Sequence, residues 1–296
     1  MKHHLMAVFC ILVWGTTFVS TKILLNHGLS PTAIFFYRFL LAYLFIWFIS
    51  PKRLFADNWK DELWFVGLGL TGGSLYYLTE NTALEITLIN NVALLVCTAP
   101  LLTALLSHLF VKGESLRRNL VYGSILALLG TALVIFNGKF ILKTNALGDL
   151  LSLSAALLWA IYTILLKRLD NRYPVVFLTR KVFFYGLLTV LPFASVSPIE
   201  TSLAVLLQPE VIFNLLFLGL LASMLCYVLW NHALKHLGAI RTSNYIYFNP
   251  VVTLITSYIV FSEQITPVAL TGALLILGGI YWAERRKRRI PMRHRK

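Results

Sequence analysis

The sequence predicts an all-α integral membrane protein: ten transmembrane helices as two inverted five-helix repeats, with both N and C termini cytoplasmic. Three observations lead to this fold class: an apolar composition, basic residues concentrated in alternate loops, and a sequence pattern that occurs twice. Apolar residues make up 58% of the 296 residues, and charged residues only 13%. Soluble domains carry roughly 25% charged residues, so this chain cannot cover a globular surface with polar groups.

Apolar runs long enough to cross a bilayer occur ten times. A helix needs about 20 such residues to span the hydrocarbon core. The first run has no small-residue cleavage site and is long enough to remain a span, which argues against a cleavable signal peptide. The spans are expected at residues 5–25, 32–50, 62–82, 90–111, 118–137, 149–167, 174–194, 211–233, 240–261 and 266–284.

The net charge of +14 is unevenly distributed along the chain. Most lysines and arginines fall in alternate loops and in the C-terminal tail, and the intervening loops carry few. This positive-inside asymmetry indicates an even number of spans with both termini in the cytoplasm. We interpret the tail, residues 286–296, as a basic segment that rests on anionic membrane lipids. An RNA-binding tail is the weaker alternative, since the remaining charge distribution argues against nucleic acid as a partner.

The repeated pattern divides the chain into a first repeat, residues 1–138, and a second repeat, residues 139–285. Because five spans is an odd number, the second repeat must have the opposite orientation. Inverted repeats are typical of secondary transporters, whose substrate site lies near the bilayer midplane between the halves. The corresponding pairs are Trp14 and Trp159, Pro100 and Pro250, Glu114 and Glu263, Gly123 and Gly272, and Gly130 and Gly279.

The two prolines fall about ten residues into their spans, close to the midplane at 1.5 Å per residue. Proline is tolerated in a membrane helix when neighbouring groups satisfy the carbonyl that it frees. Mirrored kinks at Pro100 and Pro250 therefore predict two helices that bend around a shared cavity, with a simple packing kink as the alternative. Glu114 and Glu263 are interpreted as helix N-terminal residues, because an acidic group there is stabilised by the helix dipole.

Polar side chains inside the spans are candidates for the substrate site, because polar groups at membrane depth usually face a cavity or the bundle interior. Rings and amides together suit an amphipathic solute such as an amino acid or a purine. For Tyr77 and Trp230, near span ends, the alternative is an interfacial aromatic belt. The expected substrate-binding residues are Tyr77, Glu80, Asn81, Thr98, Tyr227, Trp230, Asn231, Asn244, Tyr245, Tyr247 and Asn249.

Glu80 is the candidate proton carrier, because it is the only acidic residue expected inside a span, toward the outer leaflet. The alternative is an interfacial carboxylate paired with a basic group. Arg38 and Lys181 could pair with it or hold an anionic substrate group, although snorkelling toward the headgroups also explains both.

The repeated motif of a proline, a glutamate thirteen or fourteen residues later and two glycines resembles the drug/metabolite transporter superfamily. The segments WGTTFVSTK and AIFFYRFLLA are similar to the opening helices of its ten-helix EamA-like branch, and the resemblance covers residues 5–284. It implies a proton-linked or exchange-type exporter of small metabolites, with a central cavity lined by spans 3, 4, 8 and 9. Family membership does not identify the substrate.

The sequence thus predicts a multi-pass protein of the cytoplasmic (inner) cell membrane that exports small amphipathic metabolites by alternating access. Uptake by a facilitator or exchanger is the alternative, and an integral membrane enzyme the weaker one. We expect no enzyme, catalytic residue, cofactor or metal, because the spans contain no cluster of catalytic groups and no nucleotide loop. The direction of transport, the coupling ion and the oligomeric state, monomer or homodimer, stay undetermined. Three separated cysteines fit neither a metal nor a disulfide spacing: Cys10, Cys97 and Cys226.

Overall fold

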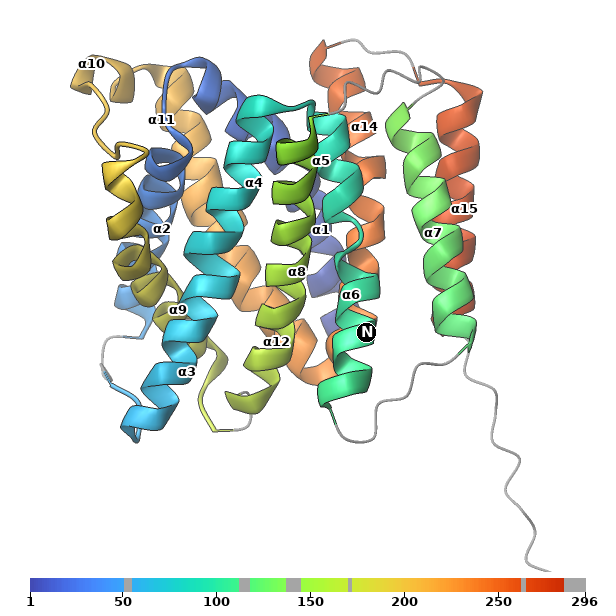
Figure 1. Cartoon of the computed structure of the whole chain (residues 1–296), viewed down its shortest axis with the longest axis horizontal. Helices are drawn as coiled ribbons and strands as arrows, with labels where there is room; N and C mark the ends of the chain where they lie inside the picture. The colour runs from blue at the N-terminus through green and yellow to red at the C-terminus, as the bar shows by residue number, and fades with distance from the viewer. Residues whose placement is uncertain (51–54, 112–117, 137–144, 170–171, 262–264, 285–296) are drawn as a thin grey trace, which may run out of the picture.

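The computed structural model describes residues 1–50, 55–111, 118–136, 145–169, 172–261 and 265–284. Within these ranges the secondary structure is entirely helical, and the helices run roughly along one common direction (Figure 1). Glu114, Glu263 and the basic tail 286–296 lie outside the described residues.

Seven stretches are long and apolar enough to cross a membrane, which identifies a multi-pass membrane protein. They are Lys2–Asn26, Pro31–Ile49, Asn91–Phe110, Arg118–Phe136, Ala146–Leu169, Val175–Ser195 and Pro209–Leu237. Pro267–Ala283 is a shorter apolar helix.

Some helices are continuous, and others consist of consecutive shorter segments. The continuous ones are α1 (Lys2–Asn26), α2 (Pro31–Ile49), α7 (Arg118–Phe136), α8 (Ala146–Leu169) and α15 (Pro267–Glu284). The segmented ones are α3 (Trp59–Gly69) with η1 (Leu70–Ser74) and α4 (Leu75–Ile86); α5 (Ile89–Val96) with α6 (Ala99–Phe110); α9 (Val175–Val190) with η2 (Leu191–Ser195); α11 (Pro209–Leu216) with η3 (Phe217–Leu225) and α12 (Cys226–Leu237); and α13 (Ala239–Asn244) with η4 (Tyr245–Phe248) and α14 (Asn249–Phe261). A single turn, α10 (Leu203–Leu206), precedes α11.

Local sequence signals set several helix ends. Ser30 caps α2 by accepting a hydrogen bond from the Ala33 amide, and Pro31 occupies the first turn, where no intrahelical donor is needed. Asn58 caps α3 in the same way. Gly238, between α12 and α13, has φ +87°, a conformation that side-chain-bearing residues rarely adopt.

The helices are irregular at corresponding places in the two halves of the chain. Leu70–Ser74 and Phe217–Leu225 are both π-helical, and Gly73 within the first has non-helical φ/ψ of −133° and −108°. The next helical rod of each half is interrupted just before its proline: α6 begins one residue before Pro100, and α14 one residue before Pro250. Proline has no N–H for an intrahelical bond, so it is best accommodated in a first turn.

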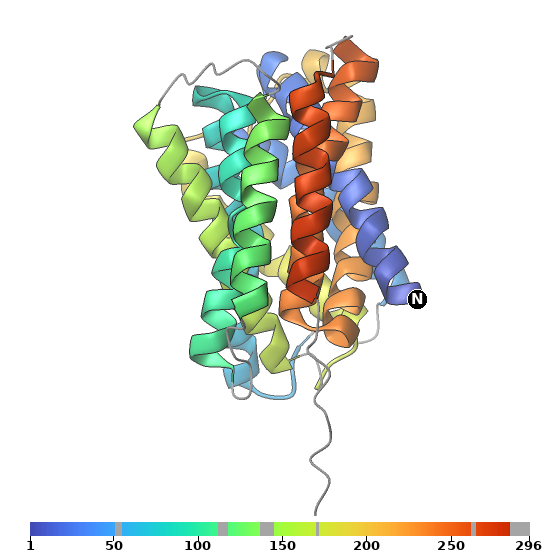
Figure 2. The same ribbon diagram turned by 90° about the vertical axis from the view of Figure 1, so that its right-hand side faces the viewer.

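Helices α7 and α15 form an antiparallel pair at one edge of the bundle, side by side in both views (Figure 1, Figure 2). Glycines bring their backbones together: a Cβ added at Gly123 would lie 2.5 Å from the Gly279 carbonyl oxygen, and one at Gly130 2.6 Å from that of Gly272. The glycines that correspond in the repeat are thus the ones that permit this close approach.

Candidate functional site

A cavity lies where α1, α2, α4, α8 and the start of α14 meet. The space between its lining atoms is about 490 Å³, including its opening. The lining residues are Trp14, Thr17 and Phe18 of α1, Arg38 of α2, Tyr76, Tyr77 and Glu80 of α4, Val96 and Ala99 of the α5–α6 rod, Trp159 of α8, Ile246 of η4 and Asn249 of α14.

Two tryptophans form one wall of this cavity. Trp14 and Trp159 make an edge-to-face contact with ring centroids 5.4 Å apart. The Trp14 indole N–H donates to the Ala222 carbonyl at 2.9 Å, which sets the orientation of its ring. Nε1 of Trp159 is buried with no hydrogen-bond partner among the described residues. A bound solute or a water molecule could accept this hydrogen bond, since buried donors are seldom left unpaired.

Tyr227 and Trp230 of α12 pack against these tryptophans. Trp230 lies 4.8 Å from Trp14 and Tyr227 5.9 Å from Trp159, measured between ring centroids. Neither α12 residue is among those that line the cavity. The lining shares spans 3, 4 and 9 with the cavity that the family resemblance implied, adds residues of α1, α2 and α8, and includes no residue of α12.

The polar part of the cavity comes from α2 and α4. The Tyr76 hydroxyl donates to Oε1 of Glu80 at 2.6 Å. Arg38 donates from Nε to the Ser223 hydroxyl at 3.0 Å, and its guanidinium carbon lies 4.2 Å from the centre of the Tyr77 ring. The cavity thus contains one buried cation and one buried carboxylate beside aromatic rings.

Asn249 adds an amide to this lining. Its side chain is buried, and Oδ1 has no hydrogen-bond partner among the described residues. The 3-10 segment η4 ends one residue before Asn249, where the α-helix α14 begins. A cavity with aromatic walls and a few polar groups can bind an amphipathic solute, because the rings cover the apolar part while the polar groups orient the rest.

The structure brings three of the expected site residues together in the cavity: Tyr77, Glu80 and Asn249. Tyr227 lies next to them: its hydroxyl donates to the Gly72 carbonyl at 2.7 Å and lies 3.2 Å from the Tyr77 hydroxyl.

The other expected residues have separate surroundings. Asn231 bridges the helices, accepting from Tyr162 and donating to Thr179, each at 3.0 Å. Asn81 donates to the Pro31 carbonyl at 3.1 Å, and Thr98 to that of Leu95 at 2.6 Å.

Three further expected residues lie in the α13–η4 region. Tyr245 bonds His4 near the start of the chain at 2.6 Å. Tyr247 packs in an apolar cluster with residues of α7 and α15, and Asn244 is buried. None of the three is among the residues that line the cavity.

The search for polar side chains missed the aromatic wall. The sequence marks Trp14 and Trp159 as corresponding residues of the two repeats, but that correspondence alone does not show that either lines a cavity. Phe18 and Ile246 carry no comparable signal, because apolar residues in a span can equally face lipid.

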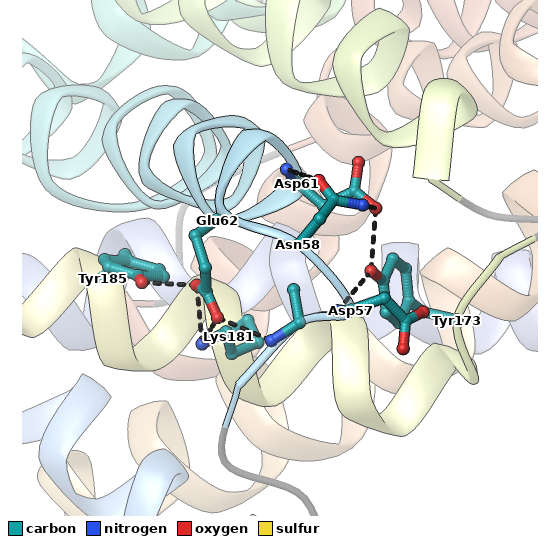
Figure 3. A network of polar contacts seen from close by, with 8 residues as sticks. Asp57, Asn58, Asp61, Glu62, Tyr173, Lys181 and Tyr185 are labelled. Atoms are coloured by element: carbon teal, nitrogen blue, oxygen red, sulfur yellow. Dashed lines mark hydrogen bonds and ion pairs between the residues drawn. The ribbon is translucent and has the colours of Figure 1, made fainter.

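A second polar cluster joins the start of α3 to α9 (Figure 3). Lys181 Nζ lies 2.8 Å from both carboxylate oxygens of Glu62. Glu62 also accepts from the Tyr185 hydroxyl at 2.5 Å and from the Ala56 amide at 2.6 Å. Lys181 is thus paired with Glu62 rather than with Glu80, and it stays outside the cavity lining.

Asp61, beside Glu62, makes a separate set of contacts, and Figure 3 shows the one with Tyr173. It accepts from the Tyr173 hydroxyl at 2.8 Å and from Arg172 at 3.0 Å. The Asp57 amide donates to the same Tyr173 hydroxyl at 2.9 Å. The two clusters attach the first turn of α3 to α9 and to the segment before it.

Comparisons with known proteins match nearly the whole chain to transporters. The profile of the EamA-like transporter family matches twice, over residues 1–136 and 146–284. An uncharacterized transporter of Archaeoglobus fulgidus is 31% identical, covering 95% of this chain and 96% of its own length. A probable amino-acid metabolite efflux pump of Salmonella typhimurium is 28% identical over 95% and 94%. A probable terminal-alkyne amino-acid exporter of Streptantibioticus cattleyicolor is 24% identical over 94% and 92%.

A solved crystal structure has the same fold, with a TM-score of 0.74. It is 20% identical in sequence, and the superposition covers 95% of this chain and 96% of that chain.

Proposed function

Since the chain belongs to the EamA-like transporter family, we propose that it is a secondary transporter that exports small amphipathic metabolites across the cytoplasmic membrane by alternating access. The observation that carries this proposal is the cavity in which Trp14 and Trp159, corresponding residues of the two halves, meet at 5.4 Å. A substrate site where two inverted repeats join is the arrangement found in many secondary transporters.

Ten membrane crossings are part of the proposal. They comprise the seven long apolar stretches, the α3–η1–α4 and α13–η4–α14 rods, and α15. The mirrored π-helical segments, the mirrored breaks before the prolines and the double family match support two repeats, residues 1–138 and 139–285. The positive-inside asymmetry supports cytoplasmic termini in the inner membrane, with the tail 286–296 on its lipid surface.

The proposed cargo is amino acid-like or purine-like. The aromatic walls and the amide of Asn249 support this chemistry. Two relatives that cover nearly the whole chain are named for amino-acid efflux. We propose Tyr77, Glu80 and Asn249 as direct contacts, and Asn81, Thr98, Tyr227, Trp230, Asn231, Asn244, Tyr245 and Tyr247 as the shell that positions them, with Pro100 and Pro250 at the bends.

Glu80 is the proposed proton carrier. Its side chain is buried within a span, lines the cavity and bonds Tyr76 through one oxygen. Ionisable groups in such positions are usually retained for function, because burying them is costly.

The test is solute exchange by the purified full chain in liposomes. Labelled amino acids, purines and sugars are offered with and without an imposed pH gradient. We expect saturable flux of an amphipathic solute that responds to the gradient. Flux that is indifferent to pH favours a facilitator or exchanger, and absence of flux for every solute overturns the proposal.

A matched pair of asparagine variants links the flux to the cavity. Asn249→Ala should reduce the flux, whereas Asn214→Ala should not, because Asn214 is also buried but bonds the Glu210 carbonyl in α11. Direction is tested in cells: expression of an exporter should lower the accumulation of the labelled solute, and higher accumulation would indicate uptake.

A further inference from the structure

Arg38 is a buried arginine with few protein partners. Only 2% of its surface is exposed, and it lies within a helix long and apolar enough to cross a membrane. Its Nε donates to the Ser223 hydroxyl, its guanidinium lies over the Tyr77 ring, and its side chain lines the cavity. No other described residue accepts a hydrogen bond from it. Cations at this depth are rare and usually belong to a substrate or ion path.

Glu80 is the opposite charge in the same cavity. Oε1 accepts from the Tyr76 hydroxyl at 2.6 Å, and no described residue donates to Oε2. Among the described residues, no ion pair within 4 Å joins Arg38 to this carboxylate. The cavity lining therefore contains a buried cation and a buried carboxylate that are not directly paired.

The same bundle pairs another buried cation directly. Lys181, 3% exposed, lies 2.8 Å from Glu62, so a close ion pair is attainable where the role is structural. Arg38 and Glu80 line a shared space without such a pair. This contrast indicates that their remaining hydrogen-bonding capacity serves something that enters the cavity.

We propose that Arg38 and Glu80 form a two-ended site for a zwitterionic cargo, a small molecule with both a carboxylate and an ammonium group. The guanidinium N–H groups bind the carboxylate, because their planar arrangement matches two carboxylate oxygens. The free oxygen of Glu80 accepts from the ammonium group. The apolar remainder of the cargo lies against Trp14 and Trp159. This inference rests on the proposed transport function and names the substrate class of that site.

The test compares three matched probes with the purified full chain: phenylalanine, phenethylamine, which lacks the carboxylate, and 3-phenylpropionate, which lacks the ammonium group. Affinity is measured by isothermal titration calorimetry in detergent. The wild type should bind phenylalanine at least about tenfold more tightly than either analogue, since each analogue leaves one buried charge unpaired.

Two variants should give a crossed result. Arg38→Gln should lose the preference for phenylalanine over phenethylamine while still discriminating against 3-phenylpropionate. Glu80→Gln should lose the preference for phenylalanine over 3-phenylpropionate while still discriminating against phenethylamine. Arg38→Lys should restore part of the carboxylate preference. Arg168→Gln is the control, because Arg168 stacks on Trp64, 4.7 Å from the ring centre, outside the cavity lining.

Size-exclusion chromatography and circular dichroism establish that each variant is folded. If Arg38→Gln does not fold, Ser223→Ala replaces it as the test of the carboxylate end. This change removes only the hydrogen bond that orients the guanidinium, so it should weaken phenylalanine binding more than phenethylamine binding. Equal wild-type affinity for all three probes, or flux of purines or sugars without binding of phenylalanine, overturns the two-ended site and leaves transport standing. Absence of flux for every solute overturns the transport function itself.

Discussion

Replacing Glu62 alone should destabilise the protein about as much as replacing Glu62 and Lys181 together. The single change Glu62→Gln leaves the Lys181 ammonium buried without a countercharge. The double change Glu62→Gln with Lys181→Met leaves no buried charge at this place. The unpaired Lys181 charge is costly because the pair is buried: only 3% of the Lys181 side chain and 18% of the Glu62 side chain are exposed.

The magnitude follows from the contacts of the pair. Breaking a buried ion pair by removing one partner typically costs about 3–5 kcal/mol, because the other charge is left unpaired. The Gln side chain can still accept one hydrogen bond from Tyr185 or Ala56, so we expect about 3 kcal/mol for Glu62→Gln. Lys181→Met should cost about 2 kcal/mol, because Glu62 keeps two donors. The double variant should also cost about 3 kcal/mol. The two single effects together exceed this by about 2 kcal/mol, which is the coupling energy of the pair.

The assay is a double-mutant cycle in mixed micelles. The free energy of unfolding is measured by circular dichroism as the fraction of a denaturing detergent rises. Glu210→Gln is the matched control, because the His27–Glu210 pair is longer, at 3.3 Å, and its side chains are 26% and 59% exposed. Exposed pairs contribute about 0–1 kcal/mol, so the control should change little. The reasoning would be refuted if the two single-variant effects summed to the double-variant effect within about 0.5 kcal/mol.

Three further results are expected. Asn249→Ala should lower kcat/KM for the transported solute about tenfold in liposomes, the loss of about one hydrogen bond, and an unchanged value would remove Asn249 from the site. Gly130→Leu should lower the apparent melting temperature by separating α7 from α15, since its Cβ alone would lie 2.6 Å from the Gly272 oxygen. Gly278→Ala is the control, because its Cβ meets no atom within 4 Å, and equal melting temperatures of the two variants would contradict the close packing. Glu80→Gln should abolish the response of flux to a pH gradient while slower exchange persists at equal pH, and a retained response would assign proton coupling elsewhere.

The candidate site was partly readable from the sequence. Tyr77, Glu80 and Asn249 were identifiable because a polar group inside an apolar run needs a reason to be there. The same rule also selected Asn231 and Asn81, which bond helix neighbours outside the cavity lining. Polarity within a span therefore indicates burial against protein, but it does not distinguish a cavity from a contact between helices.

The sequence by itself determined the helical membrane class, the family and the correspondence between the halves. Those features follow from the length of apolar runs, the positions of prolines and glycines, and the distribution of basic residues. Only the tertiary structure decided which residues surround the cavity. Trp14, Arg38 and Trp159 come from α1, α2 and α8, and only the packing of these helices places the three side chains around one space. In a soluble helix the apolar face would mark the interior, but lipid is as apolar as a protein core, so apolar residues on a membrane helix do not reveal which face turns inward.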